Sequence, residues 1–268
     1  MMESPDVAAF ARDEVLDACD GLKQQLRELR ESREPTSRGV HEIRKRAKAV
    51  RGGLALFRVG QSSGRDIQAI GRLLSATRDA ASRQATWDRL AWQEDARVAA
   101  AIRSLLGQQS EAMSGPPPPE AVAWCLERVD AAQRNLRQLP AQTLTKSFRQ
   151  GLARLGRRLR QRCGRLESGR DAGFHEARKA VKAWTGALGF LPAGLRRDQP
   201  SLDRLAERLG HENDLATLSG WLEEHGFTER FAPDLWKTVG KARRSLQRRV
   251  IRHLPGPGSL KLPCGKIR

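Results

Sequence analysis

Apolar residues recur at three- and four-residue intervals along most of the chain, which is the pattern of amphipathic α-helices. Ala, Leu, Arg, Glu and Gln dominate these stretches and favour helix over strand. Pro and Gly residues divide the pattern, and the segments 60–64 and 255–268 lack a periodic face. We predict a loop at 60–64, disorder at 255–268, and helices over 6–33, 38–59, 65–80, 87–114 (one or two helices), 120–139, 144–166, 173–191, 200–225 and 232–253.

The sequence of one predicted helix occurs twice in the chain. Val40–Phe57 reads VHEIRKRAKAVRGGLALF, and Phe174–Leu191 reads FHEARKAVKAWTGALGFL. Both begin with an apolar residue followed by His-Glu-x-Arg-Lys, and they are half the chain length apart. The stretches 73–80 (LLSATRDA) and 208–216 (RLGHENDLA) also correspond, and each half ends in a basic helix. The chain is therefore predicted to contain an internal duplication.

The repeated helix separates basic from apolar residues around its axis. At about 100° per residue, the basic side chains of the first copy fall within roughly 120° and the apolar ones lie opposite. The second copy has the same geometry, except that Thr185 replaces the position of Arg51. The basic faces comprise His41, Arg44, Lys45, Lys48 and Arg51 in the first copy, and His175, Arg178, Lys179 and Lys182 in the second. Like charges at such spacing repel one another, so an anion is expected to supply the countercharge.

The helices that close each half carry further basic residues. Lys237, Lys241 and Arg244 recur at helical spacing in the last helix, and Lys146 and Arg149 begin a looser series in 144–166. Across 268 residues there are 49 Lys and Arg against 31 Asp and Glu, a formal net charge of +18. Such an excess is typical of proteins that bind nucleic acid, an anionic membrane surface or a phosphate polymer.

Other features narrow the expected function. The four Cys residues are far apart, and we interpret them as free thiols in a reducing compartment. No secretory signal and no apolar stretch of about 18 residues is visible in the sequence. A cytoplasmic protein without a membrane span is expected. Asp79 and Asp214 occur singly and are interpreted as helix caps or partners of a neighbouring Arg, so neither a metal site nor a cofactor is predicted. We expect a protein that is not an enzyme, with a polyphosphate hydrolase as the alternative.

The basic faces contain almost no Asn, Gln or Tyr that could read bases, and the Trp and Phe residues lie mainly on apolar faces. Basic faces that contact only phosphate groups suit a phosphate polymer that has no bases. Nucleic acid, held through its phosphate backbone, stays as an alternative partner.

The two HExRK helices, with LGHENDL and LLSATRD, resemble the CHAD domain family (conserved histidine α-helical domain) over nearly the whole chain. This resemblance implies an all-α fold of duplicated antiparallel four-helix bundles, related by a pseudo-two-fold axis, with a central basic groove or pore. The halves would be 1–166 and 167–254, followed by the disordered segment 255–268. It also implies non-catalytic binding of inorganic polyphosphate, at polyphosphate granules, through His41, Arg44, Lys45, Lys48, His175, Arg178, Lys179 and Lys182, joined by Lys146, Arg149, Lys237, Lys241 and Arg244.

Overall fold

All regular structure in the described part of the chain is helical. The structure, a computed structural model, describes residues 4–32, 37–57, 61–74, 76–112, 117–167, 170–196 and 199–254. Its elements are α1 (Ser4–Glu31), α2 (Ser37–Leu56), α3 (Gln61–Leu73), α4 (Ala76–Leu90), α5 (Ala96–Ala112), α6 (Pro119–Arg137), α7 (Ala141–Cys163), α8 (Asp171–Leu188), a 3-10 turn at Ala193–Leu195, α9 (Gln199–Glu224) and α10 (Pro233–Arg252). The predicted all-α class is confirmed.

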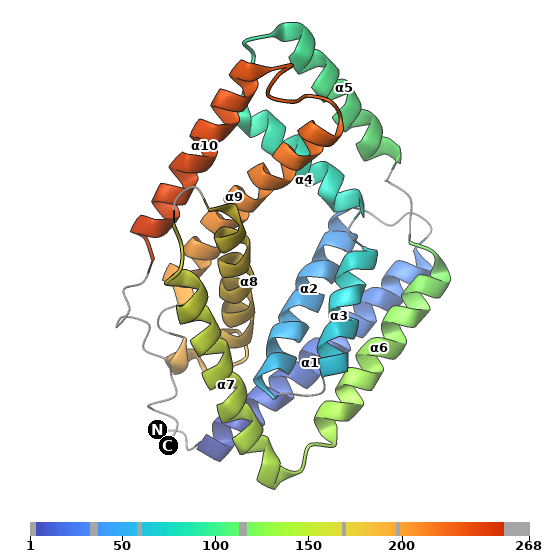
Figure 1. Ribbon diagram of the computed structural model, residues 1–268. Coiled ribbons are helices and arrows are strands. Elements are labelled where there is room, and N and C mark those ends of the chain that lie inside the picture. The colour runs from blue at the N-terminus through green and yellow to red at the C-terminus, as the bar shows by residue number, and fades with distance from the viewer. Residues whose placement is uncertain are drawn as a thin grey trace.

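Four helices from the first part of the chain form one packing group. α1 contacts α2 and α6, and α3 contacts α2 and α6, so the four close around shared apolar side chains. The largest fully buried side chains here include Leu22, Leu54, Phe57 and Ile70. Figure 1 shows this group, with α7 and α8 beside it. The apolar cluster continues from the group into α7, α8 and the first half of α9.

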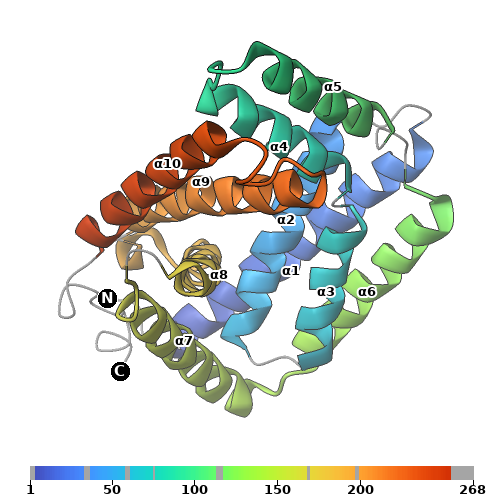
Figure 2. The ribbon, with the colours of Figure 1, turned by 45° about the horizontal axis from the view of Figure 1, so that its top comes forward.

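A second apolar cluster joins helices that are distant in sequence. Trp87 of α4 and Ile102 of α5 pack with Trp221 of α9 and Leu235 of α10. Figure 2 shows α10 along α9, with α4 and α5 at their far end. The two clusters therefore do not follow the predicted division of the chain at residues 166 and 167, because α4 and α5 pack with the helices of the second half. That division, like the duplication, stays a prediction about the sequence.

The helix α7 connects the two motif helices, because it packs against both α2 and α8. Pro140 precedes its first residue, and its apolar residues Leu144, Phe148, Leu152, Leu155 and Leu159 recur on one buried face. Gly151 lies on the same face, where a Cβ atom would overlap the carbonyl group of Leu56. The glycine thus lets α7 lie directly against the C-terminal end of α2.

Three predicted boundaries were wrong. Residues 81–86, left between two predicted helices, are helical, because α4 runs from Ala76 to Leu90. Residues 65–80 do not form one helix: α3 ends at Leu73 and α4 begins at Ala76. The carbonyl oxygen of buried Leu74 accepts a hydrogen bond of 2.7 Å from Arg44 Nη1, so a side chain takes an acceptor that a continuous helix would use internally. The predicted loop at 60–64 is helical from Gln61, and buried Ser63 accepts a hydrogen bond of 3.1 Å from Asn135 of α6.

Two expectations about the chain have different outcomes. No helix in the described ranges is long and apolar enough to cross a membrane. The segment 255–268, predicted to be disordered, lies outside the described residues.

Candidate anion-binding site

The basic face of α2 is only partly exposed. His41, Lys45 and Lys48 are exposed, whereas Arg51 is half-buried and Arg44 is buried, with 7% of its surface accessible. Burial lowers the pKa of Arg51, and the nearby positive charge of Arg158 adds to this effect. Arg44 fixes the end of α3 through the carbonyl of Leu74. The exposed residues of this face are therefore the better candidates for contact with a ligand.

The basic face of α8 has the equivalent arrangement. His175 and Lys179 are exposed, and Arg178 and Lys182 are half-buried. Glu176 pairs with Lys179 at 3.0 Å, and this hydrogen bond lowers the pKa of the carboxyl group. On α2 the corresponding pair, Glu42 and Lys45, is 3.8 Å apart. The Glu–Lys pair is therefore closer on the α8 face than on the α2 face.

The two motif helices touch at equivalent glycines. A Cβ atom on Gly52 of α2 would lie 2.8 Å from the carbonyl carbon of Gly186 and 3.0 Å from the backbone nitrogen of Ala187. Gly52 and Gly186 occupy the same position in the two sequence copies. A contact between equivalent positions is what a two-fold relation between the helices would produce. The pseudo-two-fold axis itself stays a prediction.

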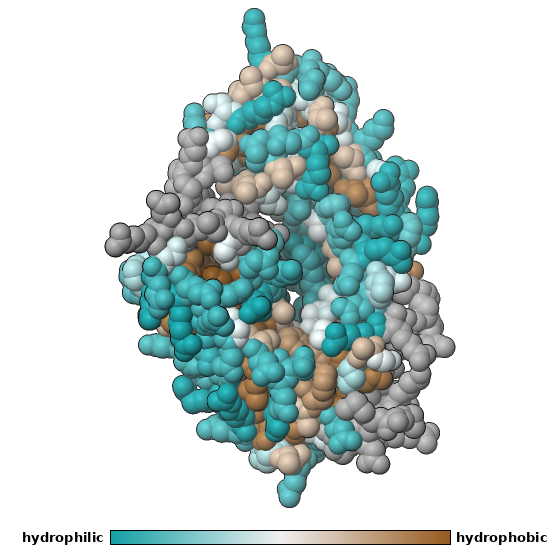
Figure 3. All heavy atoms as spheres, turned by 180° about the vertical axis from the view of Figure 1, so that it is seen from behind, coloured by the Kyte–Doolittle hydropathy of each residue, from teal (hydrophilic) through white to brown (hydrophobic). Residues whose placement is uncertain are grey.

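This contact fixes the direction of both basic faces. Gly52 falls within about 40° of His41, Lys45 and Lys48 around the axis of α2, and Gly186 has the same relation to its basic neighbours. The basic faces are therefore turned toward each other. Because the residues nearer their N-terminal ends include exposed side chains on both helices (His41, Lys45, His175 and Lys179), the helices must diverge from the glycine contact toward those ends, as Figure 1 shows. Figure 3 shows the reverse side of the molecule, hollowed near its centre and largely hydrophilic around the hollow. We call these nine residues (His41, Arg44, Lys45, Lys48, Arg51, His175, Arg178, Lys179, Lys182) the paired basic faces.

The glycine contact provides a test of this geometry with a built-in control. We expect Gly52→Ala to lower the free energy of unfolding by about 1–2 kcal/mol, because the added methyl group meets the backbone of α8. In Gly186→Ala the new Cβ would lie 3.7 Å from Gly52 Cα, an ordinary contact, so stability should not fall and should rise by up to about 1 kcal/mol, because Ala is the better helix former. Thermal and denaturant unfolding measure both. Equal losses would contradict the asymmetry of the contact.

Three arginines of α7 that the sequence analysis did not assign to the site, Arg154, Arg158 and Arg162, extend the basic surface. Arg154 Nη2 donates to the carbonyl oxygen of Ala55 at 2.7 Å, at the end of α2. Arg158 influences Arg51 electrostatically and lies 3.7 Å from Glu176, which also lies 3.9 Å from Arg162. The absence of acidic residues from this helix was the available signal, but the sequence alone did not tell which side of α7 faces α2 and α8.

Two residues of the LGHENDL stretch position the α8 face. Asn213 Oδ1 lies 3.0 Å from His175 Nδ1 and thereby orients the imidazole. Glu212 is buried, 3.0 Å from Arg243 Nη2 of α10, and Arg243 also lies 2.8 Å from Asp171 at the start of α8. The sequence analysis singled out Asp214 instead. Asp214 lies in the interior of α9, so it caps no helix end, and the side chain of Asp79 lies outside the described residues.

The remaining predicted site residues lie on the helices that close each half. Lys146 and Arg149 are exposed on α7. Lys237, Lys241 and Arg244 are exposed on α10, which packs against α9, and Lys237 pairs with Asp234 at 2.8 Å. The convergence of these five residues on one groove stays a prediction.

Titratable residues that could hold a metal do not gather in the part of the chain that the structure describes: no three His, Cys, Asp or Glu side chains lie together there. Trp184 is buried with 3% of its surface accessible, in agreement with the expectation that the Trp residues lie mainly on apolar faces. Cys19, Cys125 and Cys163 are buried free thiols, and burial raises the pKa of each, to about 12 for Cys19 and about 11 for the other two. Cys264 lies outside the described residues.

Comparison with known proteins identifies relatives by sequence and by fold. The family model described as CHAD domain matches residues 20–223. The crystal structure of the CHAD domain from the plant Ricinus communis is similar, with a TM-score of 0.57 and 20% sequence identity over 98% of this chain and 92% of that chain. No curated protein matches the chain in sequence. At 20% identity, the structural likeness concerns the fold alone.

Proposed function

Because the chain belongs to the CHAD domain family, we propose that it binds inorganic polyphosphate between the paired basic faces of α2 and α8. The observation that carries this proposal is the contact of Gly52 with Gly186, which turns two rows of cations toward the same space. A linear polyanion lying there would meet positive side chains from both helices at once. Arg can donate two parallel hydrogen bonds to phosphate oxygens, while Lys supplies a mobile charge.

The side chains around these faces favour a ligand without bases. Trp87, Trp92, Trp184 and Trp221 are each at most 5% exposed, so none of them offers a ring on which a base could stack. Asn213, the amide nearest to the α8 face by contact, is engaged with His175. The positive charges support phosphate contact, and phosphate contact alone is what polyphosphate requires.

We propose that this binding is not accompanied by hydrolysis. The acidic side chains beside the α8 face, Glu176 and Glu212, contact Lys and Arg side chains. A carboxylate engaged in this way serves to orient cations. We further propose that the protein is located at polyphosphate granules, since a chain that carries +18 and binds the polymer would accumulate where the polymer does.

A titration with polyphosphates of defined length, competed by RNA and by double-stranded DNA, tests this proposal. We expect long-chain polyphosphate to displace both nucleic acids at physiological salt, and its affinity to rise with chain length and fall steeply with salt. Release of orthophosphate is followed in the same samples and should stay at the level of the buffer. Failure of polyphosphate to displace RNA would instead favour nucleic acid as the ligand, and sustained phosphate release would favour a hydrolase.

A further inference from the structure

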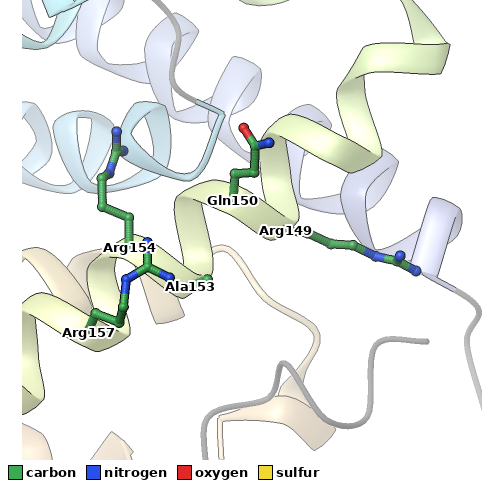
Figure 4. Close-up of a pocket in the computed structure, with 5 residues that line it drawn as sticks. All are labelled: Arg149, Gln150, Ala153, Arg154 and Arg157. Atoms are coloured by element: carbon green, nitrogen blue, oxygen red, sulfur yellow. The ribbon is translucent and has the colours of Figure 1, made fainter.

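The outer side of α7 forms a pocket outside the paired basic faces. The pocket has a volume of about 430 Å³ and is lined by Arg149, Gln150, Ala153, Arg154 and Arg157, all carried by α7. Figure 4 shows the three arginine side chains extending from successive turns of this helix. A pocket of this size is within the range of small-molecule sites, but most such sites are lined by apolar side chains. Here three of the five lining residues are cationic.

The sequence of α7 offers these arginines no acidic neighbour on their own helix. From Ala141 to Cys163 the helix contains no Asp or Glu, although it carries seven Lys and Arg residues. Arg154 and Arg157 are three residues apart, and like charges at that spacing destabilise a helix by about 0.2–0.5 kcal/mol per pair. On the inner side of the same helix, Glu176 of α8 lies near both Arg158 and Arg162. The cations of α7 thus lie on two sides of the helix, one facing α8 and one lining the pocket.

The positively charged surface on the outer side of α7 is continuous with the paired basic faces. Arg158 is close enough to Arg51 to lower the pKa of its guanidinium group, after the larger effect of burial. Arg154 is held at the end of α2 by its hydrogen bond to Ala55, and it also lines the outer pocket. Arg154 therefore lies where the surface of α2 passes into the outer side of α7. From Arg149 to Arg157 the helix rises about 12 Å, so the cations are spread along a line.

We propose that the outer side of α7 is a second binding segment for the same polyphosphate chain, with Arg149, Arg154 and Arg157 as its contacts. A long chain that leaves the paired basic faces beside Arg51 and Arg158 continues over Arg154 into this pocket, whereas a short chain occupies only the paired basic faces. The guanidinium groups donate paired hydrogen bonds to phosphate oxygens, and Gln150 contributes an amide donor. This inference rests on the proposed function and adds to it a structural cause for a preference for long chains.

The test compares Arg149→Gln/Arg154→Gln/Arg157→Gln with the unchanged protein, using tripolyphosphate and long-chain polyphosphate as ligands. We expect the variant to bind tripolyphosphate within about twofold of the unchanged protein and long-chain polyphosphate about tenfold more weakly. The slope of log affinity against log salt for the long chain should become shallower by about 2, because three phosphate contacts are lost.

Two further variants serve as controls. Arg27→Gln/Arg103→Gln/Arg134→Gln removes the same charge from exposed positions on α1, α5 and α6, and should keep long-chain affinity within about twofold. Arg149→Gln/Arg157→Gln leaves the hydrogen bond of Arg154 in place and should show a smaller loss in the same direction, even if the triple variant folds poorly.

The outcomes separate this inference from the proposed function. Equal loss in the pocket variant and the charge control, or equal loss for both ligands in the pocket variant, overturns the second segment while polyphosphate binding stands. Absence of binding by the unchanged protein overturns both.

Discussion

Replacing Lys48 and Lys182 together by Glu is expected to abolish polyphosphate binding, with a loss of at least about 100-fold in affinity. The two residues occupy equivalent positions on α2 and α8, one on each of the paired basic faces. Losing a hydrogen bond to a charged group costs about 1.5–3 kcal/mol, and each 1.4 kcal/mol is about tenfold in affinity. Each reversal also places a negative charge against the polymer. Isothermal titration with long-chain polyphosphate measures the loss.

The matched control for this variant is Arg103→Glu with Arg134→Glu. Both arginines are exposed, on α5 and α6, and the substitution changes the net charge by the same amount. This control should weaken binding by less than about threefold, through the general loss of attraction only. Similar losses in the two double variants would show that net charge, and not the paired basic faces, governs binding.

Lys48 is a better test position than Arg44 because Arg44 is buried, and Lys182 is the equivalent of Lys48 on α8. Arg44 and its equivalent Arg178 belong to the same basic faces. Arg44, however, is buried and holds the end of α3, so a Glu there would place a carboxylate beside the carbonyl oxygen of Leu74. Such a variant would lose stability through an uncompensated buried charge, and a loss of binding would then have two causes.

Gly151→Ala is expected to lower the free energy of unfolding by about 2 kcal/mol, since overpacking a close contact typically costs 1–3 kcal/mol. A methyl group at this position overlaps the carbonyl of Leu56, and a backbone group cannot move aside as a side chain could. The helix α7 would have to move away from α2. Thermal unfolding should show a midpoint lower by about 4–8 °C.

Gly220→Ala is the control for this substitution. Gly220 lies within α9, and a Cβ atom there meets nothing within 4 Å. With no contact to oppose it, the change should raise stability by about 0.5–1 kcal/mol, because Ala is the better helix former. If Gly151→Ala also stabilised the protein, close packing of α7 on α2 would be contradicted.

Much of the fold could be predicted from periodicity. The bounds of α7, α8 and α10 agree with the predicted helices to within a few residues, because Pro and Gly interrupt a strong apolar pattern at their ends. The break between α3 and α4 was missed. It coincides with the hydrogen bond from Arg44 to Leu74, two residues 30 positions apart, and no local pattern encodes such a contact.

The candidate site was also predictable in part from helical periodicity. Which side chains share a face of α2 or α8 depends only on their spacing along the helix. Which of these side chains are buried depends on neighbours from elsewhere in the chain, as the burial of Arg44 illustrates. The contact of His175 with Asn213 likewise depends on how α9 crosses α8.

The sequence by itself determined that this protein is all-helical, strongly basic and built with a repeated His-Glu-x-Arg-Lys helix, because composition and periodicity are local properties. Only the tertiary structure decided that the two repeated helices meet at Gly52 and Gly186, which turns their basic faces toward each other. It also decided that α4 and α5 pack with α9 and α10, and that Arg149, Arg154 and Arg157 of α7 line a pocket on its outer side. These features depend on contacts between residues that are far apart in sequence. The strength of such contacts is set by how the helices pack together, which the sequence of a single helix does not determine.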